Sequence, residues 1–158
     1  MTDSVSGQDV LIVQEDTVLI ISEGIQGPPG PGYPGIPGSD TPIATAGEAI
    51  SAFRGIALNQ SGNAVHATNA QAGDALRFVG IATQAAVLGG PARWKSTGGL
   101  INPAWAWDVN MPIFLGAAGE LTQTPPVAPD AAFSLAVGFA TSPTSMFVSL
   151  HDPILLAG

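Results

Sequence analysis

The sequence of 158 residues contains no cysteine and few charged side chains. Without cysteine the chain has neither a disulfide framework nor a thiolate metal site, and its cysteine content does not indicate whether it works in an oxidising or a reducing compartment. Only 10% of the residues are charged, against about 25% in an average soluble protein. The four basic residues, against twelve acidic ones, argue against a nucleic-acid partner and against docking on an anionic membrane, because both need clusters of Lys and Arg.

Long apolar runs are also missing. The two longest, "VLIV" and "VLII", are separated by the polar residues Gln14 to Thr17, so neither approaches the length of a membrane span. The first residues, "MTDSVSGQDV", contain no basic cluster of the kind that opens a secretory signal. We therefore expect a protein made in the cytoplasm, with no membrane segment.

Motifs that carry chemistry are scarce as well. Neither His66 nor His151 has a second ligand at metal-site spacing, and Lys95 lacks the glycine-rich loop of a phosphate site. No G-x-S-x-G motif is present. The stretch "GPGYPG" matches a dinucleotide fingerprint by letter only, because its prolines remove amide donors and would break the helix that should follow. We predict that the protein is not an enzyme and has no cofactor and no bound metal.

What the chain does contain is apolar residues, glycine and proline. Hydrophobic residues make up 46% of the sequence, and 20 glycines and 14 prolines indicate many turns. A monomer with so few charges would leave apolar surface uncovered, which favours oligomerisation.

The stretch "GIQGPPGPGYPGIPGSD", residues 24–40, is collagen-like. Glycine at every third position is needed where three chains crowd around one axis, so the stretch predicts a homotrimer. The triplets change register between Gly30 and Gly32, and 17 residues at roughly 3 Å each would extend over about 50 Å. The alternative is a stiff polyproline linker without a triple helix. Residues expected to set chain association are Gly27, Pro28, Pro29, Gly30, Gly35 and Gly38.

Residues 1–23 are predicted to form an N-terminal β arm. Runs of β-branched and aliphatic residues fit strands better than helices, and the polar centre from Gln14 to Thr17 permits either a hairpin or one extended strand. Neither run alternates cleanly, so both faces are expected to be covered by a partner. The residues predicted to pair with strands of a partner are Val10, Leu11, Ile12, Val13, Val18, Leu19, Ile20 and Ile21.

From residue 43 to 158 the sequence predicts an all-β domain, a small sandwich or a barrel-like unit. Short apolar runs recur every 8–12 residues with glycine-rich turns between them, which is typical of such folds. The predicted strands cover 49–58, 63–68, 75–82, 92–96, 104–109, 112–116, 135–141 and 145–151. The stretch "STGG", 96–99, is predicted to be a turn.

Two tryptophans in "AWAWD" are the most informative aromatics. On a strand Trp105 and Trp107 would point to the same face, because side chains alternate. Such a pair is typical of a core or a subunit interface, and it could also stack on a sugar ring.

Two blocks of sequence resemble structural proteins of tailed-bacteriophage virions. The lead-in "VLIVQEDTVLIISEGIQGPPGPGYPG" is similar to their N-terminal stems. The block "WKSTGGLINPAWAWDVNMPIFLGAAGELTQTPP", followed by "LAVGFATSPTSMFVSLHDPILL", resembles the β domain of capsid decoration and head-fibre proteins. The register break in the triplets departs from a regular collagen stalk, so the connector could also be an extended arm.

The resemblance implies a homotrimeric decoration protein on the outer surface of a phage head, with the major capsid protein as its partner. The alternative is a trimeric head or tail fibre that recognises a host glycan through Trp105 and Trp107. A bacterial collagen-like surface protein is a third interpretation, which the lack of a signal segment disfavours.

Overall fold

The structure, a computed structural model, describes residues 42–157. The predicted all-β class is confirmed, because these residues form the strands β1 to β12 and two short 3-10 helices, η3 (Ala72–Leu76) and η4 (Ala117–Gly119). The predicted arm (1–23) and collagen-like connector (24–40) lie outside the described residues.

The first sheet has five strands in the order β1-β5-β4-β2-β3, all paired antiparallel. Just beyond β1, Ala46 makes a parallel bridge with Ala64 of β3, and the Gly47 amide donates a 2.8 Å hydrogen bond to the Ala64 carbonyl. The two outer strands therefore meet, and the sheet curls into a barrel-like unit. Its strands are β1 (Ile43–Thr45), β2 (Gly55–Leu58), β3 (Ala64–His66), β4 (Phe78–Ala82) and β5 (Pro91–Lys95).

The interior of this unit is small and is filled mostly by alanine. Among its buried members, only Ile50, Ile56 and Trp94 have large side chains. Small residues are needed because five short strands enclose little space. The other buried members of the cluster are Ala46, Ala64, Ala82 and Ala92.

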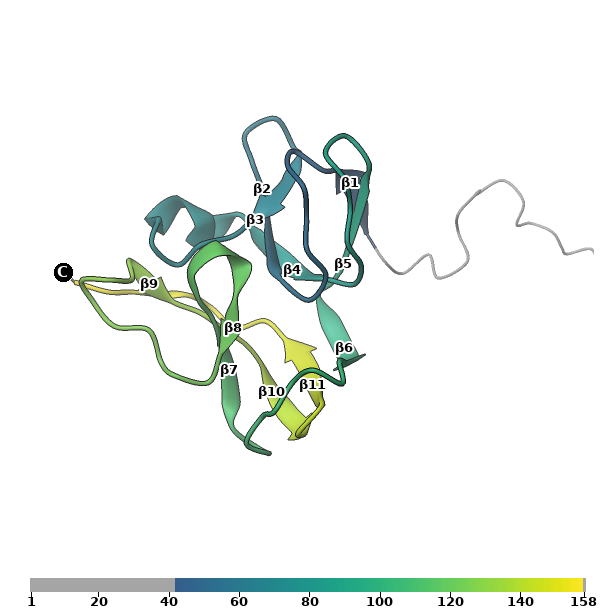
Figure 1. The fold of residues 1–158 in the computed structure, drawn as a ribbon. Coiled ribbons are helices and arrows are strands. Elements are labelled where there is room, and N and C mark those ends of the chain that lie inside the picture. Colours follow the sequence, from purple (N-terminus) through teal and green to yellow (C-terminus); the bar gives the residue numbers. More distant parts are fainter. Residues whose placement is uncertain (1–41, 158) are drawn as a thin grey trace, which may run out of the picture. The chain divides into compact units, whose positions relative to one another are not determined.

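The second sheet follows directly, because a single residue, Ser96, separates β5 from β6. Its strands run in the order β6-β11-β10-β7-β8 (Figure 1), again all antiparallel. A Cβ atom at Gly138 would collide with the Phe147 carbonyl, so glycine is needed where β10 and β11 approach. The strands are β6 (Thr97–Ile101), β7 (Pro112–Leu115), β8 (Leu121–Thr122), β10 (Ala136–Ser142) and β11 (Ser145–Ser149).

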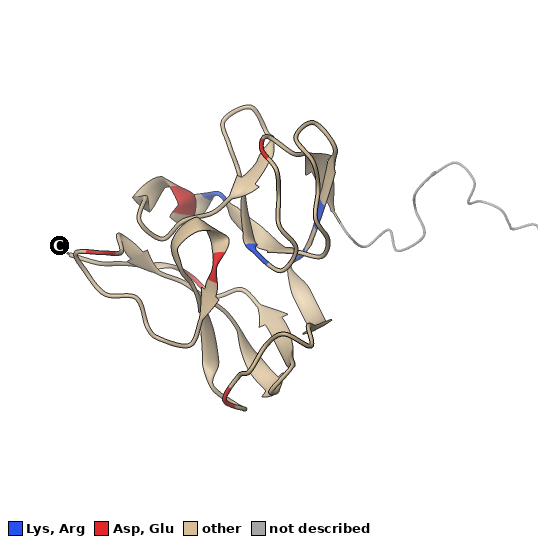
Figure 2. Cartoon of the chain, viewed as in Figure 1, with Lys and Arg blue, Asp and Glu red and all other residues tan. Residues whose placement is uncertain are grey.

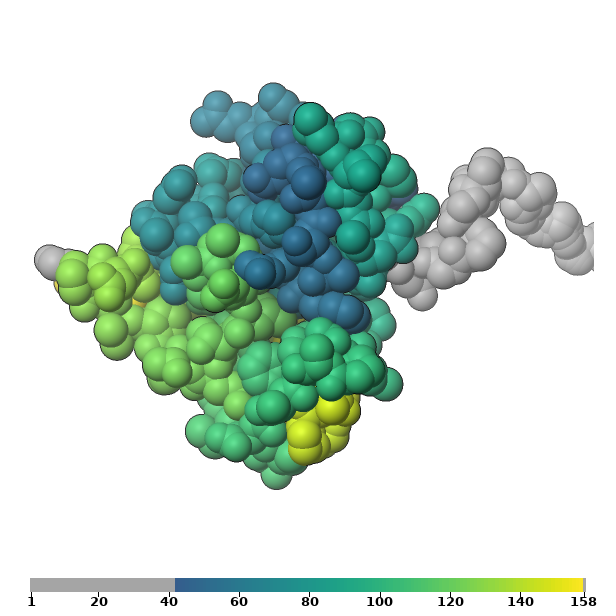
Figure 3. All heavy atoms as spheres, in the orientation of Figure 1, coloured from purple at the N-terminus to yellow at the C-terminus, as the bar shows by residue number. Residues whose placement is uncertain are grey.

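The main core lies between the two sheets. Ala57 and Ile81 of the first sheet share one cluster with the inward side chains of the second, among them Ile113, Met146 and Val148. Figure 3 shows the earlier and later parts of the described chain packed together without an intervening layer. Phe133, the largest fully buried side chain, belongs to a two-stranded ribbon of β9 (Phe133–Ser134) and β12 (Ile154–Leu155).

The predicted turn at 96–99 is wrong over 97–99, since only Ser96 is a bend. Residues 97–101 form β6, which pairs along its whole length with β11. Gly98 adopts a φ of +103°, which glycine reaches without strain, and neighbouring pairs such as Met146 with Leu100 hold the strand in register. Tertiary pairing therefore overrides the local turn preference of the glycine pair.

Candidate interaction surfaces

The second sheet contains no charged residue and no histidine. In Figure 2 strands β6, β7, β10 and β11 carry neither blue nor red, and β8 consists of Leu121 and Thr122. All four cationic residues of the chain lie outside this sheet. The outward positions of this sheet include the hydroxyl residues Thr97, Thr141, Ser145 and Ser149, but no charge. A sheet with one solvated face normally carries charged side chains there as well, so this uncharged face is suited to contact another protein.

Two phenylalanines dominate the outer face of the second sheet. Phe139 of β10 is directly opposite Phe147 of β11, and their rings stack with centroids 5.9 Å apart. Each is 41% exposed. Gly99 and Pro112 flank them in the same row, and Ile101 of the edge strand is 70% exposed. These five residues are called the Phe face below.

Strand alternation produces this surface. In β11 the even-numbered residues Met146 and Val148 are buried in the core, so Phe147 must point outward. In β10 the neighbours of Phe139, Gly138 and Ala140, are likewise buried. The sequence expectation included strands here but missed the Phe face, because the pairing of Phe139 with Phe147 depends on the register of two strands.

Strand β6 is an edge of the second sheet, paired on one side only, to β11. The Lys95 ammonium donates a 2.9 Å hydrogen bond to the Gly99 carbonyl in this strand. A lysine at a sheet edge discourages pairing with further strands. The Phe face, and not this edge, is therefore the better surface for a partner.

Trp105 and Trp107 lie together but not on a strand. The predicted strand at 104–109 is wrong, since the structure has turns and irregular backbone there. The Ala104 amide bonds the Asn102 side chain at 3.0 Å, which starts a turn. The indoles are tilted by 45° with centroids 5.4 Å apart, and Phe53 meets Trp105 edge-on at 5.3 Å. Both indoles are half-buried and pack against the main core.

A shallow groove of about 240 Å³ lies beside the two indoles. Arg54 and Glu120 contribute its charges, with 3.7 Å between Arg54 Nη1 and a Glu120 carboxylate oxygen. Phe53 has a φ of +61°, which is uncommon for a bulky residue. Backbone conformations of this kind cluster at ligand-binding and catalytic sites. The groove thus offers an apolar wall and polar groups, which are the elements that bind a small polar ring.

Two further groups of titratable side chains stabilise loops. The Glu48 carboxylate accepts a 2.6 Å hydrogen bond from the His66 backbone amide and lies 3.3 Å from Nδ1 of the His66 ring. The other ring nitrogen of His66, Nε2, accepts a hydrogen bond from the Ser51 backbone amide. Asp74, only 5% exposed, accepts hydrogen bonds from the Thr68 amide and from Arg77. Within residues 42–157 no three His, Cys, Asp or Glu side chains gather as metal ligands would.

The other predicted site residues fall outside the part that the structure describes. These are the association residues Gly27, Pro28, Pro29, Gly30, Gly35 and Gly38 and the strand-pairing residues from Val10 to Val13 and from Val18 to Ile21. Their roles stay predictions. None of the helices in residues 42–157 has the length and apolar character needed to traverse a bilayer.

Comparison with known proteins gives no assignment. The sequence matches no protein-family model, and a search of curated proteins finds no significant match.

Proposed function

We propose that this chain is a structural protein of a tailed-bacteriophage virion, a homotrimeric decoration protein bound to the outer surface of the head. Its partners are two further copies of itself and the major capsid protein. Its role is mechanical: three copies of a modest contact, joined in one trimer, bind far more strongly than one. Such a trimer, bridging neighbouring shell subunits, opposes the pressure of the packaged DNA.

The observation that carries this proposal is the Phe face. A stacked aromatic pair in an uncharged sheet supplies apolar area for binding a protein. The sequence adds the collagen-like triplets, which favour three chains, and the resemblance to virion proteins. We assign the contact with the major capsid protein to the Phe face.

The number of copies per virus particle tests the proposal. Quantitative mass spectrometry of purified particles, calibrated against the major shell protein, should give hundreds of copies, as a lattice of decoration trimers requires. A dozen or a few dozen copies would place the protein at a vertex or on a tail and contradict the decoration role.

A second candidate function is glycan recognition by a trimeric head or tail fibre. The groove beside Trp105 and Trp107 favours it, because it combines indole surface with Arg54 and Glu120. Its volume, about 240 Å³, is below that of a typical drug-sized pocket and fits about one ring.

Acrylamide quenching of tryptophan fluorescence tests the glycan function. The third tryptophan, Trp94, is buried inside the barrel-like unit and supplies an unquenched baseline. If the groove binds a sugar, host surface polysaccharide should reduce quenching of Trp105 and Trp107 in a saturable way. A matched Glu120→Gln variant should need more polysaccharide for the same protection. Quenching that polysaccharide leaves unchanged would exclude the indoles as a glycan site.

A further inference from the structure

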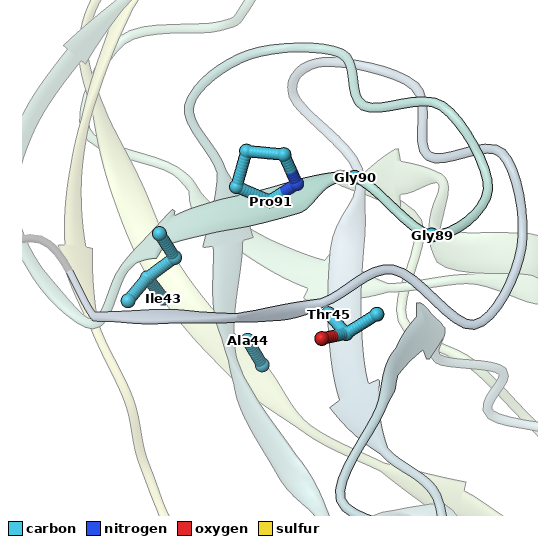
Figure 4. A pocket seen from close by; sticks show the side chains of 6 residues that line it. All are labelled: Ile43, Ala44, Thr45, Gly89, Gly90 and Pro91. Carbon is cyan, nitrogen blue, oxygen red and sulfur yellow. The ribbon is translucent and has the colours of Figure 1, made fainter.

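A second apolar surface surrounds β1, where the collagen-like connector joins the described domain. Ile43, Val87 and Leu88 are 53%, 74% and 70% exposed. Beside them is a recess lined by Ile43, Ala44, Thr45, Gly89, Gly90 and Pro91 (Figure 4), with a volume of about 430 Å³. None of the lining residues is charged.

Val87 and Leu88, called the tip below, lie in the same β4–β5 connection as the glycines that line the recess. The Ala46 amide donates to the Gly90 carbonyl and the Gly89 amide donates to the Ala46 carbonyl, each at 2.8 Å, which fixes the β4–β5 connection against the end of β1. Gly89 has a φ of +81°, and a Cβ atom there would meet nothing within 4 Å. The missing side chains keep the recess open, while Val87 and Leu88 project beside it.

A triple helix formed by the triplets would limit how far this surface could lie from its axis. Gly38, the last glycine of the triplets, precedes Ile43 by five residues. Five extended residues reach at most about 18 Å. Three chains joined at their triplets would therefore hold three copies of the recess near one another, so the occupant that the chain itself supplies is a second copy.

We propose that the recess beside β1 receives Val87 and Leu88 of a neighbouring copy, which closes a ring of three subunits. Tip and recess are different surfaces of the same protomer, so the contact is head-to-tail, and three such contacts satisfy every tip and every recess. This inference rests on the trimer of the proposed function and names the surface that holds it. About five triplets are too few to hold three chains by themselves, so the apolar contact supplies what they lack.

The double substitution Val87→Asp with Leu88→Asp tests the contact in the full-length chain. It should raise the concentration at which the trimer half-dissociates at least tenfold, measured by light scattering, because each interface would bury two unpaired carboxylates. Both side chains are exposed, so the circular dichroism spectrum should not change. The matched control is Phe139→Asp with Phe147→Asp, which makes the same charge change on the Phe face and should leave the trimer intact.

The outcomes separate the two proposals. The wild-type chain should scatter as about 48 kDa, three times 15.9 kDa. A wild-type monomer would contradict the trimer itself. If the Val87 and Leu88 variant forms a trimer as stable as that of the control variant, the trimer itself is supported and the assignment of its interface is overturned.

Cross-linking gives an independent measurement, because the chain has no cysteine of its own. A single Leu88→Cys variant treated with a short bis-maleimide should yield covalent dimers, since three such residues would lie near one axis. A Leu155→Cys variant carries an equally exposed leucine near the C-terminus, which Figure 1 places on the far side of the domain from β1, and should stay monomeric on a denaturing gel. Equal yields from both variants would overturn the proposal.

Discussion

Replacing Phe139 and Phe147 together with aspartate is expected to reduce binding to phage heads by about 100-fold or more. Burying each partly exposed ring in a contact contributes on the order of 1 kcal/mol, and an unpaired carboxylate in a dry interface costs several kcal/mol. A factor of ten in affinity corresponds to about 1.4 kcal/mol. Co-sedimentation of the variant with heads that lack the protein would measure the loss.

The control for this prediction is Leu76→Asp with Val127→Asp. It makes the same charge change at two exposed apolar residues outside the second sheet, 89% and 65% exposed. This control should sediment with heads as the wild type does. If the Phe variant also binds normally, residues 1–41 become the better candidates for the shell contact, and our assignment is wrong. If it loses its trimer, the Phe face is a subunit interface instead.

The strands that the sequence predicts best are those whose pattern is local. In "SMFVSLH" buried residues alternate with more exposed ones over Ser145–Ser149, and in "LAVGFAT" they alternate except at the consecutive buried pair Val137 and Gly138. The structure has β10 and β11 there. Their turn, at Pro143 and Thr144, is marked by proline. Such segments need no knowledge of the rest of the chain, which is why both the all-β class and these strands could be predicted.

Other elements depend on partners distant in sequence. The glycine pair Gly98 and Gly99 has a turn-like composition and lies in a strand because β11 pairs with it. The stretch around Trp105 has a strand-like composition, but it contains the Asn102 turn, and the Trp105 ring packs against Phe53 from a distant segment. The local pattern of a single sequence does not show which distant segments pair.

The candidate surfaces also divide into those that local sequence predicts and those that depend on distant segments. The sequence identified Trp105 and Trp107 by residue type, and the structure does bring them together. The stacking of Phe139 on Phe147 follows from the register of β10 against β11, and the recess beside β1 follows from the closure of the first sheet. Surfaces assembled from several strands become visible only when the topology is known.

Replacing Phe133 with alanine is expected to have the largest effect on stability. Phe133 is completely buried in the main core and belongs to the ribbon of β9 and β12. Truncating a buried phenylalanine typically costs about 3–5 kcal/mol, because apolar contacts are lost and a cavity remains. Since a domain is usually stable by only about 5–15 kcal/mol, this loss is a large fraction of the total.

Urea unfolding followed by tryptophan fluorescence would measure the effect. All samples should have the same protein concentration, because the stability of a trimer depends on concentration. The matched control is Phe139→Ala, which removes the same side chain from a position that is 41% exposed. It should cost on the order of 1 kcal/mol, because much of that ring is already in contact with water. Equal losses for the two variants would mean that Phe139 is as buried in solution as Phe133. That result would show that a partner already covers the Phe face in the isolated protein, and it would move the contact from the shell to a subunit of the trimer.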